Sequence, residues 1–155
     1  MYYTDYIYSS YTFESVDFRL EDVFGNSWEC DCEYPIREFW TEQIRCEFQD
    51  NRSQRRWSLR DTLLTSGDTQ IQIGSYSRIE GKKPFFATKI LSYTFTSAGK
   101  RIGLVEMSGL PGNEALRIHP DINIEKGLAI SAAAMAFILK NRRSYYSDYT
   151  EGLID

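Results

Sequence analysis

The sequence predicts a mainly β fold with one central helix. We expect a closed antiparallel β-barrel that encloses a hydrophobic C-terminal α-helix at about residues 123–140. Two observations predict it: one apolar stretch near the C-terminus, and roughly ten short strand-like segments, spaced by about 8–12 residues, through the rest of the chain. A helix that is apolar all round has to be buried all round. A sheet closed around it would bury it and would leave no exposed edge.

The apolar stretch is too short to cross a bilayer. Its 13 residues from Gly127 to Leu139 carry no charge, and they make about 20 Å of helix against about 30 Å of hydrocarbon core. Lys126 and Lys140 close the stretch at both ends. Asp121 or Asn123 can cap the helix through a side-chain oxygen. We therefore expect the central helix of a soluble domain and no transmembrane segment.

The clearest strand pattern runs through residues 28–34. Trp28, Cys30, Cys32 and Tyr34 point one way and the acidic residues between them point the other way, which is typical of a half-buried strand. Residues 22–26 and 50–53 are predicted turns. The segments that we interpret as strands are 2–13, 16–20, 28–34, 39–48, 56–64, 70–73, 85–95, 101–107, 114–119 and, after the helix, 144–149.

Composition limits the class of protein. At 155 residues, a single domain spanning 1–155 is the expectation. The 42% hydrophobic and 26% charged residues are ordinary globular values. A net charge of -4 argues against a nucleic-acid partner, because nucleic-acid binders usually carry a basic excess. The N-terminus shows no signal-peptide pattern, and three cysteines are an odd count. We expect a cytoplasmic protein, peripheral at membranes, with buried free thiols and no disulfide framework.

The segment Ile118–Leu139, IHPDINIEKGLAISAAAMAFIL, resembles the end of the tubby C-terminal-like superfamily. That superfamily includes the tubby domain, the phospholipid scramblases and the LURP-one-related proteins. The shared pattern is a strand, a Pro or Asp turn, an alternating polar–apolar step and a hydrophobic helix. The Asp121–Ile124 step is most similar to the scramblase and LURP-one-related branches. The resemblance implies a β-barrel threaded by the helix, and a role in binding anionic phospholipid or phosphoinositide head groups. Scramblases carry an acidic, calcium-associated segment here, but Gly112–His119 holds one acid and one arginine, so no metal site is carried over.

Catalytic and metal sites are not predicted, and neither is a cofactor. His119 is the only histidine, and we interpret it as a residue that packs or caps before the helix rather than as a catalytic base. Cys30, Cys32 and Cys46 lack the spacing of a zinc site. Phosphate-loop, dinucleotide and zinc-protease motifs are absent from the sequence. An acidic strip comprises Glu29, Asp31, Glu33, Glu38 and Glu42. Two of these carboxylates could act as a general acid–base pair, but we prefer to interpret the strip as a solvated strand face.

Clustered basic residues are the best candidate for a functional site. Arg52, Arg55, Arg56 and Arg60 are the predicted lipid contacts, and Trp57 beside them would suit a membrane interface. The hypothesis is a non-catalytic binding module that meets an anionic membrane lipid surface. The alternative is a protein-interaction or structural domain with no lipid affinity, whose partner is another protein. Further basic pairs could join such a site: Lys82 and Lys83, Lys100 and Arg101, and Arg142 and Arg143.

Overall fold

A computed structural model of the chain describes residues 5–9, 13–35, 44–77, 90–107 and 113–154. The chain divides into two compact units, Met1–Ile71 and Gln72–Asp155. Each unit is described by itself below. The expectation of one domain over residues 1–155 stays a prediction.

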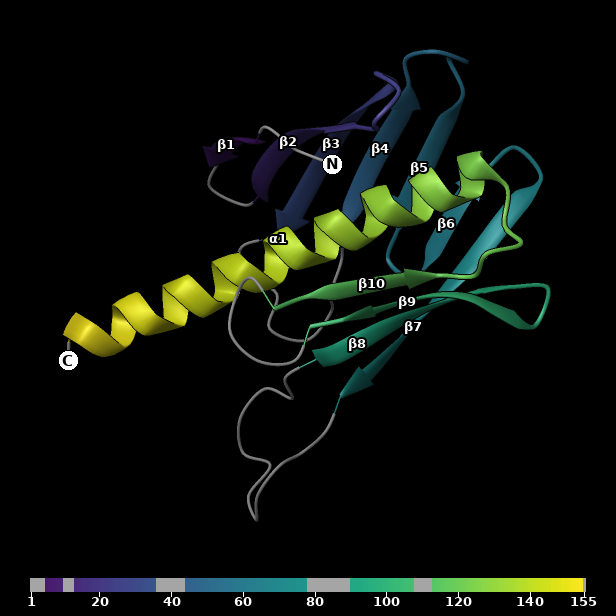
Figure 1. The fold of residues 1–155 in the computed structure, drawn as a ribbon. Helices are drawn as coiled ribbons and strands as arrows, with labels where there is room; N and C mark the ends of the chain where they lie inside the picture. The colour runs from purple at the N-terminus through teal and green to yellow at the C-terminus, as the bar shows by residue number, and fades with distance from the viewer. Residues whose placement is uncertain (1–4, 10–12, 36–43, 78–89, 108–112, 155) are drawn as a thin grey trace. The chain divides into compact units, whose positions relative to one another are not determined.

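Unit 1 is an antiparallel meander, in which the strands lie side by side in chain order (Figure 1). Every strand from β1 to β5 pairs with the next one along the chain. Antiparallel hairpins of this kind need only a few residues to reverse the chain. The strands are β1 (Asp5–Ser9), β2 (Phe13–Glu21), β3 (Ser27–Pro35), β4 (Arg45–Asp50), β5 (Arg56–Arg60), β6 (Leu63–Ser66) and the start of β7 (Thr69–Ser77).

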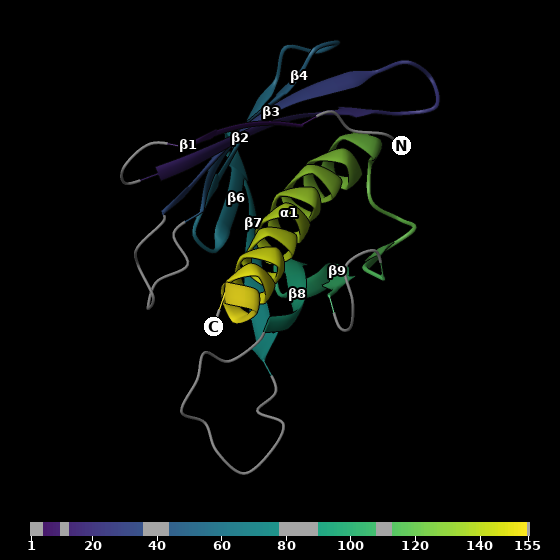
Figure 2. The ribbon, with the colours of Figure 1, turned by 90° about the vertical axis from the view of Figure 1, so that its left-hand side faces the viewer.

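Unit 2 contains the rest of β7, three more antiparallel strands and the helix. The strands are β8 (Ile90–Ser97), β9 (Lys100–Glu106) and β10 (Ala115–Ile118), and they pair in chain order. The helix α1 runs from Ile124 to Ile154. Figure 2 shows it as one continuous rod.

The core of unit 1 confirms the alternation in the sequence. On β3, Trp28, Cys30, Cys32 and Tyr34 are at most 4% exposed, whereas the acidic residues between them are exposed. The neighbouring strands follow the same period of two, because successive side chains of a strand point to opposite faces of the sheet. One face of this sheet is therefore apolar and buried, and the other carries the charges.

The helix begins where the sequence predicts. The Asn123 side-chain oxygen accepts a hydrogen bond from the backbone N–H of Lys126 at 2.8 Å, which is N-cap geometry. Burial is not confined to one face, since residues 129–134 and 136–139 are all buried. Within unit 2, Phe137 stacks on Tyr93 of β8 with ring centroids 4.0 Å apart. Most of the apolar stretch is therefore buried, while Gly127, Leu128 and Met135 are half-buried.

The prediction of a closed barrel is wrong. The sheet is antiparallel and open, with its strands in the order β1 to β10, and no pairing joins β1 to β10 among the described residues. The prediction took burial of the helix as a reason for closure. Burial depends on side-chain packing, whereas closure depends on backbone hydrogen bonds between the first and last strands. The first condition can therefore be met without the second.

Two further predictions are wrong: the end of the helix near Lys140 and a strand at residues 144–149. α1 has 31 residues and continues through residues 144–149, where the sequence suggested a strand. No glycine or proline occurs between Lys140 and Gly152, so nothing in the sequence stops the helix at Lys140. No helix in the described part of the chain is both long enough and apolar enough to cross a membrane.

A disulfide joins two of the three cysteines, contrary to the expectation of free thiols. Cys32 of β3 lies directly opposite Cys46 of β4, with their Cα atoms 4.1 Å apart and their sulfurs bonded. Directly opposed residues in a non-hydrogen-bonded pair of an antiparallel sheet are about 4.5 Å apart, close enough for this link. Cys30 is buried and free. Burial raises the pKa of its thiol well above the usual value, so the thiolate is disfavoured.

Candidate functional site: the hairpin end of unit 1

Two turns that are far apart in the sequence lie side by side at one end of unit 1. They are the β2–β3 turn (22–26) and the β4–β5 turn (51–55). The backbone N–H of Asn51 donates to the carbonyl of Ser27 at 3.0 Å, and the Asn51 side-chain amide donates to Ser27 Oγ at 2.8 Å. Arg52 Nη1 donates to Asn26 Oδ1 at 3.4 Å. These bonds hold the two turns together as one surface.

The β2–β3 turn presents two apolar side chains to solvent. Val23 is 87% exposed and Phe24 is 85% exposed. The turn under them is well ordered by Asp22, whose Oδ1 accepts from the backbone N–H groups of Phe24 at 2.8 Å and Asn26 at 2.9 Å. Gly25 has a φ of 84°, which the turn requires and which glycine adopts without strain.

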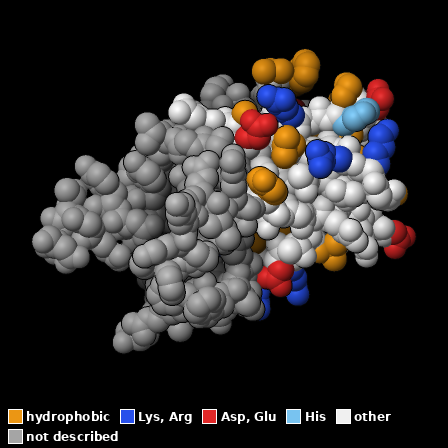
Figure 3. Space-filling view, turned by 90° about the horizontal axis from the view of Figure 1, so that it is seen from below, with side chains coloured by type: hydrophobic (Ala, Val, Ile, Leu, Met, Phe, Trp, Pro, Cys, Tyr) orange, Lys and Arg blue, Asp and Glu red, His pale blue; other side chains and the backbone are white. Residues whose placement is uncertain are grey.

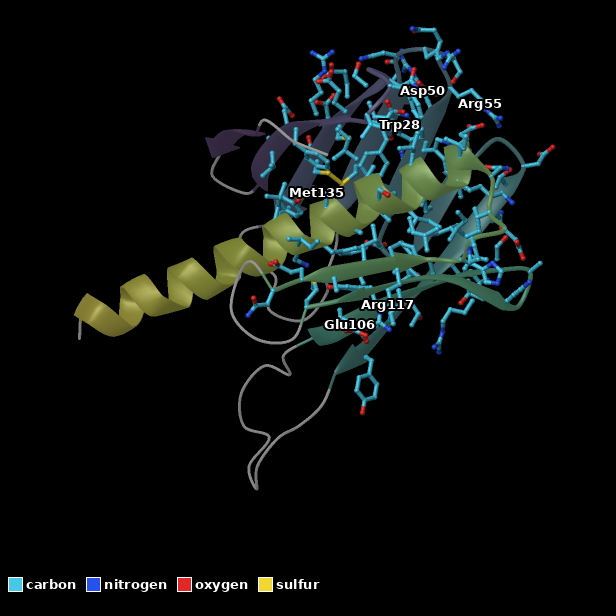
Figure 4. All side chains as sticks on the ribbon, viewed as in Figure 1. Trp28, Asp50, Arg55, Glu106, Arg117 and Met135 are labelled. Atoms are coloured by element: carbon cyan, nitrogen blue, oxygen red, sulfur yellow. A yellow bond between two sulfur atoms is a disulfide. The ribbon has the colours of Figure 1, made fainter. Side chains whose placement is uncertain are left out.

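The β4–β5 turn and the first residue of β5 present the arginines. Arg52, Arg55 and Arg56 are all exposed. Asp50 fixes this turn by accepting from the backbone N–H of Arg52 at 2.9 Å and from Ser53 Oγ at 2.8 Å. Figure 4 shows Arg55 pointing outward near Asp50, at the same end of the sheet as Trp28. We call the surface formed by Val23, Phe24, Arg52, Arg55 and Arg56 the hairpin end.

The carboxylates near this surface are engaged within the fold. Asp22 Oδ2 accepts from the Asn26 side-chain amide at 2.9 Å. That hydrogen bond is the main reason why the pKa of Asp22 lies below its usual value, and the nearby charge of Arg52 adds to the lowering. Glu29 is 3.5 Å from Arg19 Nε. The acidic groups therefore stabilise the turns, while the apolar and arginine side chains face outward.

The four arginines that the sequence grouped do not form one cluster. Arg52, Arg55 and Arg56 come together at the hairpin end, but Arg60 ends β5 and lies directly opposite Arg45 of β4. Trp57 is 1% exposed, so the prediction of an interfacial position for it is wrong. Its place on β5 turns it into the core, because it alternates with the exposed Arg56. Among the other basic pairs, Lys100 and Arg101 are exposed in unit 2. The pair Lys82 and Lys83 lies outside the described residues. The side chains of Arg142 and Arg143 are likewise not among those described.

His119 has the local role that the sequence suggested. Its Nδ1 accepts from the backbone N–H of Asp121 at 3.2 Å, and the same atom is 3.9 Å from Asp121 Oδ2. It lines a cavity of about 320 Å³ in unit 2 together with Lys100 and Lys126. Figure 3 shows the histidine at the surface with lysine or arginine side chains nearby. No group of three or more metal-binding side chains comes together in the part of the chain that the structure describes.

Sequence reasoning missed Val23 and Phe24. It identified residues 22–26 as a turn but did not use the two apolar residues within it. Turn residues are usually small or polar, so two adjacent large apolar residues between Asp22 and Gly25 were a usable signal. Their closeness to the arginines was not visible, because it depends on hydrogen bonds between residues 24 to 26 positions apart.

Comparison of the chain with protein-family models, with curated proteins and with solved structures gives no match. The resemblance to the tubby C-terminal-like superfamily therefore stays a prediction.

Proposed function

We propose that this chain is a non-catalytic binding module that docks on anionic phospholipid membranes through the hairpin end. The observation that supports this most is the pairing of chemistries at one fixed surface. Val23 and Phe24 are almost fully exposed on an ordered turn, and Arg52 is tied to that turn by a hydrogen bond. Apolar side chains can enter the acyl boundary while arginines contact phosphate and carboxylate groups above it. The resemblance to lipid-binding tubby-like and scramblase-like proteins points in the same direction.

The magnitudes favour reversible binding. Each arginine near an anionic surface contributes about 1 kcal/mol, so Arg52, Arg55 and Arg56 contribute about 3 kcal/mol together. Full burial of a valine or phenylalanine side chain contributes about 1.5–3 kcal/mol. Immobilising the protein at the surface offsets part of this sum. Neither the arginines nor the apolar pair is sufficient alone, so removing either set should release the protein.

The test is co-sedimentation with vesicles of phosphatidylcholine alone, or of phosphatidylcholine with phosphatidylserine or a phosphoinositide, at low and high salt. We expect binding to the anionic vesicles that weakens with salt, because salt screens exposed charges. Reversing Arg55 and Arg56 to Glu should reduce the free energy of binding by about 4 kcal/mol, since two attractions become two repulsions. Val23→Ser with Phe24→Ser should weaken binding even at low salt.

Matched controls come from unit 2. Reversing Lys100 and Arg101 to Glu changes the net charge by the same amount but leaves the hairpin end intact, so binding should persist. Leu116→Ser with Ile124→Ser removes exposed apolar residues elsewhere and should also leave binding unchanged. Unchanged binding by the Arg55/Arg56 variant would refute the assignment. Absence of binding by the wild type to every vesicle would favour the alternative, a protein-interaction domain without lipid affinity.

A further inference from the structure

A second charged surface of unit 1 lies on the outer face of its sheet and is separate from the hairpin end. It is a cavity of about 250 Å³ over β2, β3, β4 and β5. Its volume is close to the lower end of the range for small-molecule pockets, about 300–1000 Å³. The polar side chains that line it come from two neighbouring rows of the sheet, so the strand register decides which charges meet.

The first row is acidic. Asp17 of β2 lies directly opposite Asp31 of β3, and Asp31 lies directly opposite Glu47 of β4. Like charges placed directly opposite each other destabilise a sheet. Burial and the neighbouring Asp17 carboxyl group raise the pKa of Asp31 above its usual value, because both disfavour the charged form of Asp31. Glu47 Oε2 accepts from Ser58 Oγ at 2.7 Å. A positive charge above this row would remove the repulsion.

The second row brings two arginines together. Arg45 of β4 lies directly opposite Arg60 of β5, and both are exposed. Glu33 of β3 is opposite Arg45 on its other side. Neither arginine forms an ion pair with any residue in the described part of the chain. An anion above the two guanidinium groups would relieve the repulsion between them, and arginine suits phosphate and carboxylate because its donors form a planar fork.

The rows are two residues apart along each strand, which is about 7 Å at the backbone. A simple anion at the arginines would meet the carboxylates, and a simple cation at the carboxylates would meet the arginines. A ligand that carries both charges, separated by several bonds, satisfies both rows at once.

We propose that this cavity binds a small zwitterion, whose ammonium group contacts Asp17, Asp31 and Glu47 and whose phosphate or carboxylate group contacts Arg45 and Arg60. An aminoalkyl phosphate has this chemistry, either as a free metabolite or as the head group of a zwitterionic phospholipid. The proposal does not depend on docking by the hairpin end, because the two surfaces share no residue.

The experiment is calorimetric titration of the full chain with O-phosphoethanolamine, with ethanolamine and inorganic phosphate as the single-charge controls. We expect phosphoethanolamine to bind, and each single-charge probe to bind about tenfold more weakly or worse, since each loses one set of charge-assisted contacts. Asp31→Asn and Arg60→Gln should each weaken phosphoethanolamine binding by about tenfold. Glu47→Gln tests the acidic row a second time if Asp31→Asn disturbs the fold.

Matched controls separate this site from the membrane-docking surface. Arg101→Gln removes one exposed arginine of unit 2, and reversal of Arg55 and Arg56 to Glu disables the hairpin end; both should leave phosphoethanolamine binding unchanged. The proposal would be overturned if inorganic phosphate bound as tightly as phosphoethanolamine. It would also be overturned if neither Asp31→Asn nor Glu47→Gln weakened the binding of phosphoethanolamine. Vesicles with and without phosphatidylethanolamine then identify the source: vesicle binding that Arg60→Gln removes indicates the lipid head group, and binding of the soluble probe alone indicates the free metabolite.

Discussion

The Cys32–Cys46 disulfide should be a major contributor to the stability of unit 1. The perturbation is Cys32→Ala with Cys46→Ala. These residues are 14 positions apart, and both side chains are buried. A cross-link stabilises the fold mainly by restricting the unfolded chain, and for a loop of this length the chain-entropy estimate is about 3 kcal/mol. At a urea m value of about 2 kcal/mol/M, the unfolding midpoint should fall by about 1.5 M.

The assay is urea unfolding followed by tryptophan fluorescence, because Trp28 and Trp57 are both buried in unit 1. Each protein is unfolded with and without reductant. The wild type should lose about 3 kcal/mol when reduced, whereas the double variant should be insensitive to reductant. Cys30→Ala is the matched control: it removes a buried thiol from the same face of β3 but no cross-link. Its midpoint should still respond to reductant.

Two results would refute this reasoning. If oxidised and reduced wild type unfold at the same urea concentration, the link does not restrict the unfolded chain as the loop length requires. If Cys30→Ala abolishes the response to reductant, the bond involves Cys30 rather than the Cys32–Cys46 pair. Thiol titration of the unfolded, unreduced protein gives an independent check, with one free thiol expected from three cysteines.

Three further predictions concern the helix, its contact with the sheet and the acidic row. Ala133→Asp places an unpaired charge at a fully buried helix position and should lower the free energy of unfolding by more than about 4 kcal/mol. The control Ile124→Asp changes an exposed residue of the first helical turn and should be close to neutral. If Ala133→Asp unfolds like the wild type, this face of the helix is open to water. Gly103→Val should destabilise by about 1–3 kcal/mol, because even a Cβ at Gly103 would lie 3.1 Å from Ile130 Cγ2; a stabilised variant would show spare room between β9 and α1. Asp31→Asn should change how stability depends on pH. The pKa of Asp31 is raised in the folded state, so the folded state binds more protons and wild-type stability falls as the pH rises through that pKa. The variant should lack this fall when unfolding is measured from pH 3 to 7.

Local patterns predicted much of the secondary structure. The alternation through residues 28–34 identified both faces of β3, because a strand has a side-chain period of two. The cap at Asn123 and the uncharged run after it located the start of α1. Long-range pairing was not predictable in the same way. Parity allowed Cys46 to approach either Cys30 or Cys32, and only the β3–β4 register selects Cys32.

The candidate site was predicted in part. The sequence identified Arg52, Arg55 and Arg56 as a basic group, but it added Arg60, which the register places beside Arg45 in a different surface. It also placed Trp57 at an interface, although alternation along β5 buries that side chain. Arg56 and Arg60 share the exposed face of β5 but stand four residues apart along it, about 13 Å, so one basic cluster in the sequence separates into two surfaces in the fold.

By itself, the sequence determined where strands alternate, where the helix begins and which helix residues are buried, because these follow from local periodicity and capping. The tertiary structure decided that the sheet is open, that Cys32 bonds with Cys46, that Val23 and Phe24 share a surface with the arginines, and that Asp17, Asp31, Arg45 and Arg60 line one cavity. Each of these depends on which strands pair and in which register. The pattern of one strand sets which of its faces is buried, but its partner strand and the register between the two are chosen by packing and hydrogen bonding between distant segments.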